Sequence, residues 1–293
     1  MPDEQRGPID LHTHSSVSDG TETPAELVAQ AASQGLSAVA LTDHDSTAGW
    51  ADASAAARAH GITLVPGMEM STQLEYASVH VLAYLFDPED ADLAAMTARV
   101  RGERMTRAEA MVGRIGRDYA LTWDDVLAQT TPGSTIGRPH IADALVARGH
   151  VATRSAAFES ILHWQGGYYR PHFAPDPILG VELITAAGGL AVLAHPGARG
   201  PERVLSDSRM TSLVTAGLFG LEVRHRDNPP ASRVRLTELA DRFGLEVTGS
   251  SDYHGDGKPN RLAENTTEPA VLARIVERAT GWAPVIPPSA TAA

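Results

Sequence analysis

Histidine and carboxylate side chains follow the ends of short apolar runs throughout this chain, and that placement constrains its fold more than any other feature. The side chains in question are His12, His14, Asp19, His44, Glu69, His80, His195, Asp252 and His254. Short aliphatic or β-branched runs are typical of buried strands. Parallel strands present their carboxyl ends on one face, so we expect these side chains to converge in space. Imidazoles and carboxylates without a thiol predict a site for several divalent metal ions.

Strand and helix patterns alternate over most of the chain. A capping sequence, Thr23-Pro24-Ala25-Glu26, begins a helix predicted over residues 25–34. After a first strand near residue 9, further strands are predicted over residues 37–41, 62–65, 79–86, 190–194, 220–223 and 245–248. Additional helices are predicted over residues 47–60, 177–187 and 230–243. The β-α-β-α-β order of the first part predicts a parallel sheet with right-handed crossovers.

The alternation stops between residues 89 and 176, where the sequence is mainly helical. A structureless loop of that length is uncommon in a compact domain. We therefore expect a helical insertion subdomain over residues 89–176. It would interrupt a barrel domain made of residues 8–88 and 177–283. The Pro-, Ala- and Ser-rich residues 284–293 are predicted to form a flexible tail.

Composition narrows the choice of partners. The chain has 293 residues, of which 43% are hydrophobic and 20% charged, and this fits one barrel-sized globular domain. A net charge of −12 argues against binding to duplex DNA. It does not argue against a small phosphorylated substrate, because bound metal ions would reverse the local sign of the charge. With no cysteine in the chain, disulfides and thiolate metal sites are excluded.

The sequence also suggests where the protein works. Residues 1–7 are polar and lack the apolar core of a signal peptide. No uninterrupted apolar stretch approaches the length that spans a membrane. We therefore expect a cytoplasmic protein without membrane partners.

The residues around the candidate ligands resemble the motifs of the PHP (polymerase and histidinol phosphatase) superfamily. The matching segments are His12-Thr13-His14 with Ser18-Asp19-Gly20, Thr42-Asp43-His44, Gly67-Met68-Glu69 and Asp252-Tyr253-His254. Residues 137–142 and 187–196 further resemble the nucleotide-phosphatase branch of that superfamily. Members of this branch remove the 3′-phosphate of 3′,5′-bisphosphonucleotides, and some degrade short RNA from its 5′ end.

This resemblance implies an α/β fold, a distorted (β/α)7 barrel with the helical insertion, and a trinuclear metal site. The three divalent ions would be manganese, iron or zinc. Matched position by position, one ion would be held by His12, His14, Glu69 and Asp252, a second by Glu69, His80 and His195, and a third by Asp19, His44 and His254. The implied activity is that of a hydrolase acting on phosphate esters, in which a metal-activated hydroxide attacks phosphorus.

Four other polar residues are candidates for contact with the substrate. Arg138 and His140 lie before an apolar helical run and could clamp a phosphate, although an exposed helix start is the alternative. His225 follows a strand and could bind phosphate or protonate the leaving group, unless it is a surface histidine. Arg170 is a further candidate for substrate binding. We expect catalytic roles for Arg138, His140 and His225.

A row of arginines recurs every three residues in the insertion, at Arg101, Arg104 and Arg107. Residues three apart share one face of a helix. The sequence therefore predicts a solvated, basic helix face, to which we assign no function.

The sequence thus predicts a metal-dependent phosphoesterase. Its substrate would be a phosphomonoester of a small nucleotide (a 3′,5′-bisphosphonucleotide or an AMP-like compound) or the 5′ end of short single-stranded RNA. One alternative is a phosphatase or phosphodiesterase of the same superfamily acting on histidinol phosphate or another small metabolite. Another is an amidohydrolase-type deaminase, but many such enzymes use a bridging modified lysine, and the only lysine, Lys258, lies in a Gly/Pro loop. The third is a non-catalytic metal-binding module.

Overall fold

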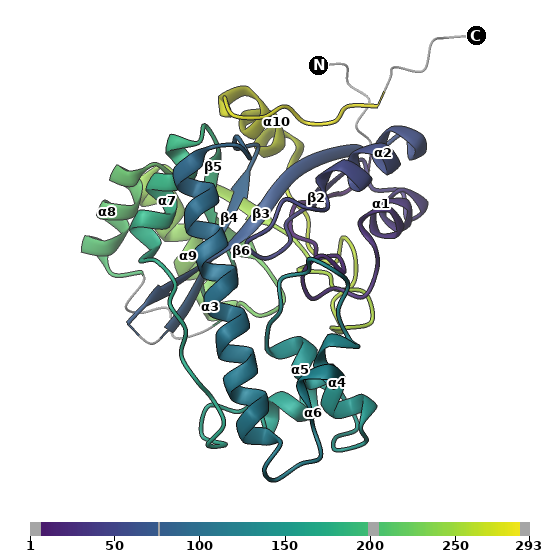
Figure 1. Ribbon diagram of the computed structural model, residues 1–293. Helices are drawn as coiled ribbons and strands as arrows, with labels where there is room; N and C mark the ends of the chain where they lie inside the picture. The colour runs from purple at the N-terminus through teal and green to yellow at the C-terminus, as the bar shows by residue number, and fades with distance from the viewer. Residues whose placement is uncertain (1–6, 76, 199–204, 288–293) are drawn as a thin grey trace.

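The computed structural model describes residues 7–75, 77–198 and 205–287 (Figure 1). Within these residues, seven strands form one sheet in the order β1-β2-β3-β4-β5-β6-β7. The strands are β1 (Ile9–Asp10), β2 (Ala38–Leu41), β3 (Thr63–Leu74), β4 (Ala77–Tyr84), β5 (Leu190–Leu193), β6 (Leu218–Arg224) and β7 (Glu246–Gly249). A bridge between Thr13, just after β1, and Tyr253, just after β7, brings the two edges together. The sheet is therefore a nearly closed barrel, as the sequence predicts.

Strand direction varies around the barrel. Strands β1, β2 and β3 are parallel, which confirms the order predicted for the first part of the chain. Strand β4 is antiparallel to both β3 and β5. Only two residues separate β3 from β4, and a parallel crossover between them would need many more. Strand β4 thus begins at the end of the barrel where the other strands finish. This reversal places His80, paired in register with Ser71, at the same end as the other candidate ligands.

The side chains of the strands alternate between two cores. In β2, Ala38 and Ala40 belong to the cluster inside the barrel, whereas Val39 and Leu41 belong to the cluster between the strands and the surrounding helices. A period of two is expected of a strand that is covered on both faces. All four of these residues are buried, so the sheet is a rigid frame for the polar groups at its end.

Of the next six helices, the first five pack against the outside of the barrel, and the last packs against the cluster inside it. They are α1 (Pro24–Ser33), α2 (Trp50–His60), α7 (Pro177–Ala186), α8 (Asp207–Ala216), α9 (Pro230–Phe243) and α10 (Pro269–Arg278). The predicted capping box of α1 is present, since Thr23 Oγ1 accepts a hydrogen bond from the Glu26 backbone. The sequence analysis did not predict α8 or α10. None of the helices in the described segments is long and apolar enough to cross a membrane.

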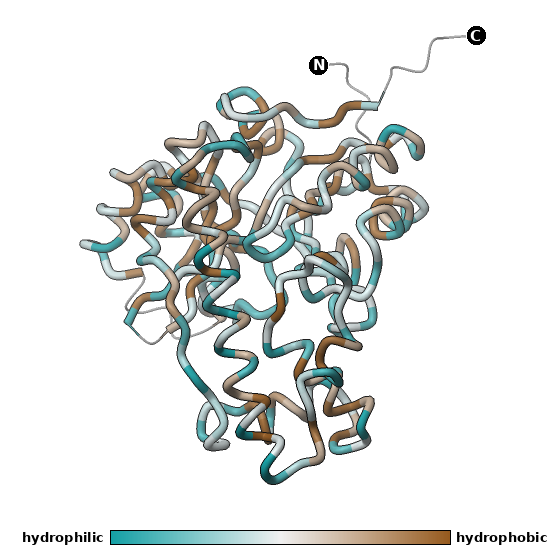
Figure 2. The backbone as a smooth tube through the Cα atoms, in the orientation of Figure 1, coloured by the Kyte–Doolittle hydropathy of each residue, from teal (hydrophilic) through white to brown (hydrophobic). Residues whose placement is uncertain are grey.

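Four helices form the insertion: α3 (Ala91–Ile115), α4 (Trp123–Leu127), α5 (Arg138–Ala147) and α6 (Arg154–Glu159). Helix α3 runs from the barrel to a separate group formed by α4, α5 and α6 (Figure 1). These helices share a hydrophobic cluster of their own, which includes Met111, Ile141 and Leu145. Figure 2 accordingly shows hydrophobic segments in both the barrel and the lower helical group.

The insertion contacts the loop that follows β1. The Thr135 backbone N–H donates to Val17 O at 2.8 Å, and Thr131 Oγ1 donates to Ser16 O at 2.9 Å. Arg154 of α6 reaches the same loop, with its Nη1 3.0 Å from Asp19 O. The insertion is thereby fixed against the loop that carries one of the candidate metal ligands.

The C-terminal segment is partly held against the barrel. Val285 and Leu64 exchange backbone hydrogen bonds of 2.9 and 3.0 Å, and Val285 is buried. The sequence predicts a flexible tail over residues 284–293, but Val285 is held in place. The last part of that tail, residues 288–293, lies outside the described residues.

Candidate metal centre

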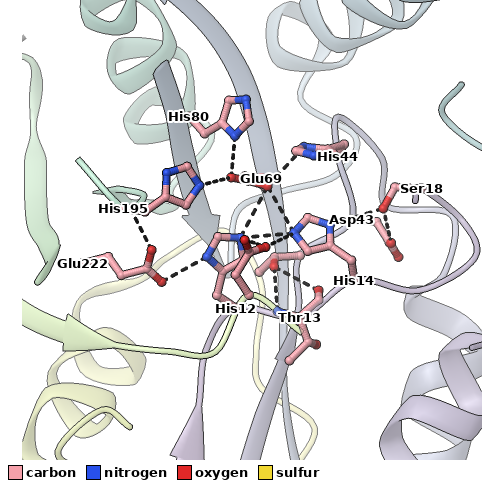
Figure 3. Close-up of polar contacts among 12 residues, drawn as sticks. His12, Thr13, His14, Ser18, Asp43, His44, Glu69, His80, His195 and Glu222 are labelled. Carbon is pink, nitrogen blue, oxygen red and sulfur yellow. Dashed lines mark hydrogen bonds and ion pairs between the residues drawn. The ribbon is translucent and has the colours of Figure 1, made fainter. Parts of the chain in front are cut away.

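The nine predicted metal ligands converge at one end of the barrel, and Figure 3 labels six of them: His12, His14, His44, Glu69, His80 and His195. They lie on β3 and β4 and in the loops that follow β1, β2, β5 and β7. Seven of them are buried, and His80 and His195 are half-buried. Residues separated by more than 200 positions in the sequence thus share one site.

Glu69 is at the centre of the group (Figure 3). One carboxylate oxygen, Oε1, lies 2.7 Å from His80 Nδ1 and 3.2 Å from His195 Nε2. The other, Oε2, lies 3.1 Å from both His14 Nε2 and His44 Nδ1. A single carboxylate therefore contacts imidazoles on four different segments, the arrangement expected of a group that bridges two metal ions.

The ligand atoms form groups of the size that holds one ion. Within each group these atoms lie within 4.8 Å of one another: His14, Asp19, His44 and His254; His12, His14, Glu69 and Asp252; and His44, Glu69 and His80. The second group has the same four members as the first predicted ion site. The first group contains all three residues predicted for the third ion. The third group contains Glu69 and His80, which are two of the three residues predicted for the second ion. The other predicted residue, His195, contacts Glu69.

The chemistry of these atoms fits divalent metal ions. Asp19 Oδ1, His44 Nδ1 and His254 Nε2 are buried and make no hydrogen bond among the described residues, and their close contacts are with other candidate ligands. Buried polar atoms are ordinarily hydrogen-bonded, so these atoms are available to hold a metal ion. Mixed nitrogen and oxygen ligands are suitable for manganese, iron or zinc.

The carboxylates of the site are held in the ionised form that metal binding requires. Burial alone would raise the pKa of Asp19 and Glu69, but the neighbouring imidazoles lower it well below the usual value. Burial would also raise the pKa of Asp252, but Lys258 and then His254 lower it well below its usual value.

Glu222 supports this group from behind, and the sequence analysis missed it. Its side chain is fully buried, with Oε1 3.0 Å from His12 Nδ1. Its Oε2 accepts a 2.7 Å hydrogen bond from the backbone N–H of His195. Although burial raises its pKa, His12 and then His225 bring that pKa to about 2, so Glu222 stays ionised. A carboxylate bound to one ring nitrogen of a histidine orients the other nitrogen toward a metal.

Replacing Glu222 by glutamine is expected to weaken metal binding by about 10- to 100-fold, because His12 would lose the charge that orients and polarises its ring. Competition with a chelating dye would measure the affinity. Glu238→Gln, which alters an exposed acid on α9, is the matched control. Equal affinities in the two variants would show that His12 is oriented without Glu222.

Asp43 supports His14 through a serine. Its Oδ1 accepts a 2.6 Å hydrogen bond from Ser18 Oγ, which lies 3.3 Å from His14 Nδ1. The backbone N–H of Ser15 donates to the same carboxylate oxygen at 2.8 Å. The conformation of the loop after β1 is therefore fixed by an acid from the loop after β2.

A cavity of about 470 Å³ lies over the candidate metal ligands, within the usual volume range of small-molecule sites. Six of the nine predicted ligands line it: Asp19, His44, Glu69, His80, His195 and Asp252. Five cationic side chains also line it: Arg104, Arg107, Arg138, Arg154 and Lys258. The cavity therefore gathers five cationic side chains beside five carboxylates, those of Asp19, Glu69, Glu159, Asp227 and Asp252.

The structure brings only one of the four predicted substrate-contacting residues to this cavity. Arg138 lines it, with its guanidinium 5.3 Å from the ring centre of Phe158. Arg170 is exposed and is not among the lining residues, and its contact with the substrate stays a prediction. His140 is buried and likewise does not line the cavity. Its Nδ1 accepts a hydrogen bond from the Gly137 N–H at 3.1 Å, which gives it a structural role at the start of α5.

His225 lies below the cavity rather than in its wall. It is 0% exposed, and its Nδ1 accepts a 3.1 Å hydrogen bond from the Asp227 N–H. Its Nε2 lies 3.7 Å from Asp252 Oδ2, and its ligand atom lies within 4.8 Å of those of His12 and Glu222. His225 is therefore close to the candidate metal ligands but is not among the residues that line the cavity.

Lys258 lies in a loop after β7, as the sequence indicates. The structure places its Nζ 2.7 Å from Asp252 Oδ2, at the edge of the cavity. Burial would lower the pKa of Lys258, but Asp252 and Asp19 raise it above the usual value. The side chain is therefore an ammonium ion, a state unlike the modified lysine that bridges metals in the deaminase alternative.

Comparison with known proteins gives matches over nearly the whole chain. A family model described as PHP domain matches residues 10–120. The 3′,5′-nucleoside bisphosphate phosphatase of Chromobacterium violaceum is 33% identical, over 92% of this chain and 95% of its own length. The 5′-3′ exoribonuclease of Haemophilus influenzae is 30% identical, over 84% of this chain and 89% of its own. A solved structure from Bifidobacterium adolescentis, described as a metal-dependent phosphoesterase, is 45% identical with a TM-score of 0.90, over 94% of this chain and 97% of its own.

Proposed function

Since the chain belongs to the PHP-domain family of metal-dependent phosphoesterases, we propose that it hydrolyses a phosphate ester of a small nucleotide. The substrate would be a 3′,5′-bisphosphonucleotide or the 5′ end of a short RNA, in keeping with the two relatives named above. The observation that carries this proposal is the single cavity in which imidazoles and carboxylates that fit metal ions lie beside five cationic side chains. Metal ions and basic side chains together are the groups that bind phosphate esters.

In this proposal the site holds three divalent ions of manganese, iron or zinc. The ligands are His12, His14, Glu69 and Asp252 for one ion, Glu69, His80 and His195 for the second, and Asp19, His44 and His254 for the third. When bound, such ions neutralise charge on phosphate oxygens and acidify water. Glu69 belongs to two of these sets, so its ionised carboxylate couples them.

The other residues of the cavity bind and orient the substrate. Arg138 presents a planar guanidinium that can pair with two phosphate oxygens. Lys258 adds a point charge beside Asp252. The fully buried His225 lies beside His12 and Glu222 and helps to keep the ligands below the cavity in place. The insertion closes one side of the cavity, which favours small or single-stranded substrates over duplexes.

Replacing Arg138 by alanine is expected to raise KM for phosphorylated nucleotides by about 10-fold, because a charge-assisted hydrogen bond to phosphate is lost. Steady-state phosphate release would measure KM and kcat separately. The control is Arg117→Ala, which removes an exposed arginine outside the cavity. A KM equal to that of the unmodified protein would show that Arg138 does not touch the substrate.

Phosphate release from a panel of substrates tests the proposal as a whole. The manganese-loaded protein would be given adenosine 3′,5′-bisphosphate, AMP, histidinol phosphate, a short 5′-phosphorylated RNA and a generic phosphodiester. We expect the bisphosphate or the RNA to be hydrolysed fastest. Preference for histidinol phosphate or the diester would support the alternative of a small-metabolite phosphoesterase. No turnover of any substrate by metal-loaded protein would favour the non-catalytic metal-binding module.

A further inference from the structure

Arg154 of α6 lies where three segments of the chain meet. Its Nη1 donates to the backbone carbonyl oxygen of Asp19, in the loop after β1, at 3.0 Å. Gly257, in the loop after β7, packs so closely on the guanidinium that a Cβ at this position would overlap it. Asp19 and His254, two of the three predicted ligands of the third ion, lie in these two loops. Arg154 therefore joins the insertion to both loops beside one ion site.

The guanidinium of Arg154 is held by Asp143 of α5. Nε and Nη2 of Arg154 lie 2.8 and 2.5 Å from the two carboxylate oxygens of Asp143. The two side chains are 14% and 26% exposed, so the pair is partly shielded from solvent. A two-pronged pair of this kind fixes the plane of a guanidinium. It leaves Nη1 directed at Asp19, so Asp143 sets the position from which Arg154 holds the loop.

The two loops are also tied to each other beside Arg154. The Thr21 backbone N–H donates to His254 O at 3.2 Å, and Thr21 Oγ1 accepts from the Asp256 N–H at 2.9 Å. Gly255 allows this approach, because it has a positive φ of 62° and a Cβ there would overlap Thr21 Oγ1. The loops after β1 and β7 therefore form one unit, which Arg154 contacts from the insertion.

Two facing ligand atoms of this unit depend on the loops for their position. Asp19 Oδ1 lies 3.1 Å from His254 Nε2, and neither atom makes a hydrogen bond among the described residues. The ring of His254 is anchored to its own loop, since its Nδ1 lies 2.8 Å from Asp252 O. The separation of the two ligand atoms therefore follows the separation of the two loops.

The ligands of the other two predicted ions are held differently. Glu69 and His80 lie on the paired strands β3 and β4, and His12 lies two residues after β1. The ring of His12 is further supported by Glu222 of β6. The barrel strands thus position these ligands directly, without a contact from Arg154.

We propose that Arg154, held by Asp143, is a positioning residue for the third predicted ion, and that the helical insertion thereby sets the affinity of that ion. This inference rests on the proposed function, because the third ion belongs to the trinuclear site proposed there. Arg154 does not touch the ion, but keeps Asp19 and His254 at the separation that the ion requires. Because the pair lies within the insertion, displacement of α5 and α6 would release one ion and leave the other two bound.

Manganese binding by Asp143→Asn tests this role without a substrate. The change keeps the shape of the side chain and removes its charge, and Asp143 is not among the residues that line the cavity. In competition with a chelating dye, we expect one of three manganese ions to bind about 10-fold more weakly, as is usual when support for a metal ligand is lost. The other two affinities should match those of Asp124→Asn, a control at an exposed acid of the insertion. Three unchanged affinities, or equal weakening of all three, would overturn the proposal.

Arg154→Met distinguishes positioning from the charge of the arginine. A cation beside the site repels metal ions, so removing it would tighten manganese binding if charge were its only effect. Positioning predicts the opposite, with one ion bound about 10- to 100-fold more weakly. The control is Arg148→Met, at another arginine of the insertion that lies beside an acid, Asp125, and outside the cavity. Tighter binding of manganese by Arg154→Met would contradict the proposal.

The double variant shows whether Asp143 acts through Arg154. Once Arg154 is replaced, the carboxylate of Asp143 has no guanidinium to hold. Arg154→Met combined with Asp143→Asn should therefore bind the third manganese ion no more weakly than Arg154→Met alone. Losses that add in full would reveal two independent effects and refute the coupling of the pair.

Turnover separates this proposal from the proposed function. With adenosine 3′,5′-bisphosphate, Asp143→Asn should have a lower kcat at limiting manganese, an unchanged KM, and a kcat that excess manganese restores. A raised KM with unchanged metal affinities would place the pair in substrate binding and overturn the proposal. An unmodified protein that binds three manganese ions but hydrolyses no substrate would refute the proposed function. The selective loss of one ion in Asp143→Asn would still support the role of Arg154.

Thermal unfolding tests a purely structural role. Manganese bound to the folded protein raises its melting temperature by mass action. At one manganese concentration, the rise above chelator-treated protein should be smaller for Asp143→Asn than for Asp124→Asn. A melting temperature lowered equally with and without manganese would assign the pair to the fold alone.

If Asp143→Asn does not fold, Arg154→Lys carries the test, because it keeps the charge and loses the two-pronged pair. It should weaken the same single manganese ion about 10-fold. Full affinity for all three ions in a folded Arg154→Lys protein would refute the proposal.

Discussion

Replacing Glu69 by alanine is expected to lower kcat for phosphate release by about 10³-fold or more. The two oxygens of Glu69 lie 2.7 to 3.2 Å from four rings, those of His14, His44, His80 and His195. The substitution would remove the negative charge of the carboxylate from beside all four rings. Losing several kcal/mol of transition-state stabilisation from bound metal corresponds to a change of this size. Elemental analysis should show that most of the bound metal is lost with the activity.

The control for this change is Glu238→Ala, which removes an exposed acid of α9. It should keep both the metal and the turnover. Circular dichroism would establish that Glu69→Ala is folded, as expected of a barrel whose hydrophobic clusters do not include Glu69. A folded Glu69→Ala protein with full metal content and normal turnover would contradict the assignment of Glu69 as the shared ligand.

Replacing Asp19 by alanine is expected to remove one metal ion and to lower kcat by about 10²-fold. Asp19 Oδ1 lies 3.1 Å from His254 Nε2, and Oδ2 lies 3.8 Å from His44 Nε2. Of the three groups, only the one that contains His254 would lose its carboxylate. The other two groups keep Glu69. Metal content and phosphate release measured on one preparation would check the two expectations together.

Asp256→Ala is the matched control for Asp19→Ala, because Asp256 is an exposed acid that follows His254 closely and lies outside the cavity. It should retain the full metal content. An unchanged rate and metal content in Asp19→Ala would discard the assignment of a third ion.

The residues predicted as metal ligands could be found from the sequence because of where strands end. A strand in a barrel fixes the position of the residue that follows it, so His12, His44 and His195 could be placed at one end without coordinates. His80 lies on a strand that runs in the opposite direction. It reaches the same end because it is near the start of β4, and its position in the apolar run did not reveal this.

The basic wall of the cavity could not be placed in the same way. Four of its five cationic side chains, those of Arg104, Arg107, Arg138 and Arg154, are carried by the insertion. The helices of the insertion contact the barrel through tertiary packing that a single helix pattern does not specify. Arg104 and Arg107 therefore looked like solvated residues, whereas they are buried.

Glu222 and Lys258 show two other limits of sequence reasoning. Glu222 is an acid within the apolar strand β6, and such a residue is costly to bury unless it is paired. The acid within an apolar run can be recognised in the sequence. Its partner cannot, because His12, which Glu222 contacts, is 210 positions away. Lys258 lies in a loop after β7, and only the path of that loop brings its Nζ to Asp252.

The central claim is that this barrel end binds metal ions and uses them to hydrolyse a phosphorylated nucleotide. The measurement that tests it most directly is phosphate release from adenosine 3′,5′-bisphosphate by protein treated with a chelator and then titrated with manganese. We expect no release from the stripped protein and a rate that rises to a plateau at three equivalents of bound metal. Undiminished release after the metal has been removed, or no release from fully loaded protein, would contradict the claim.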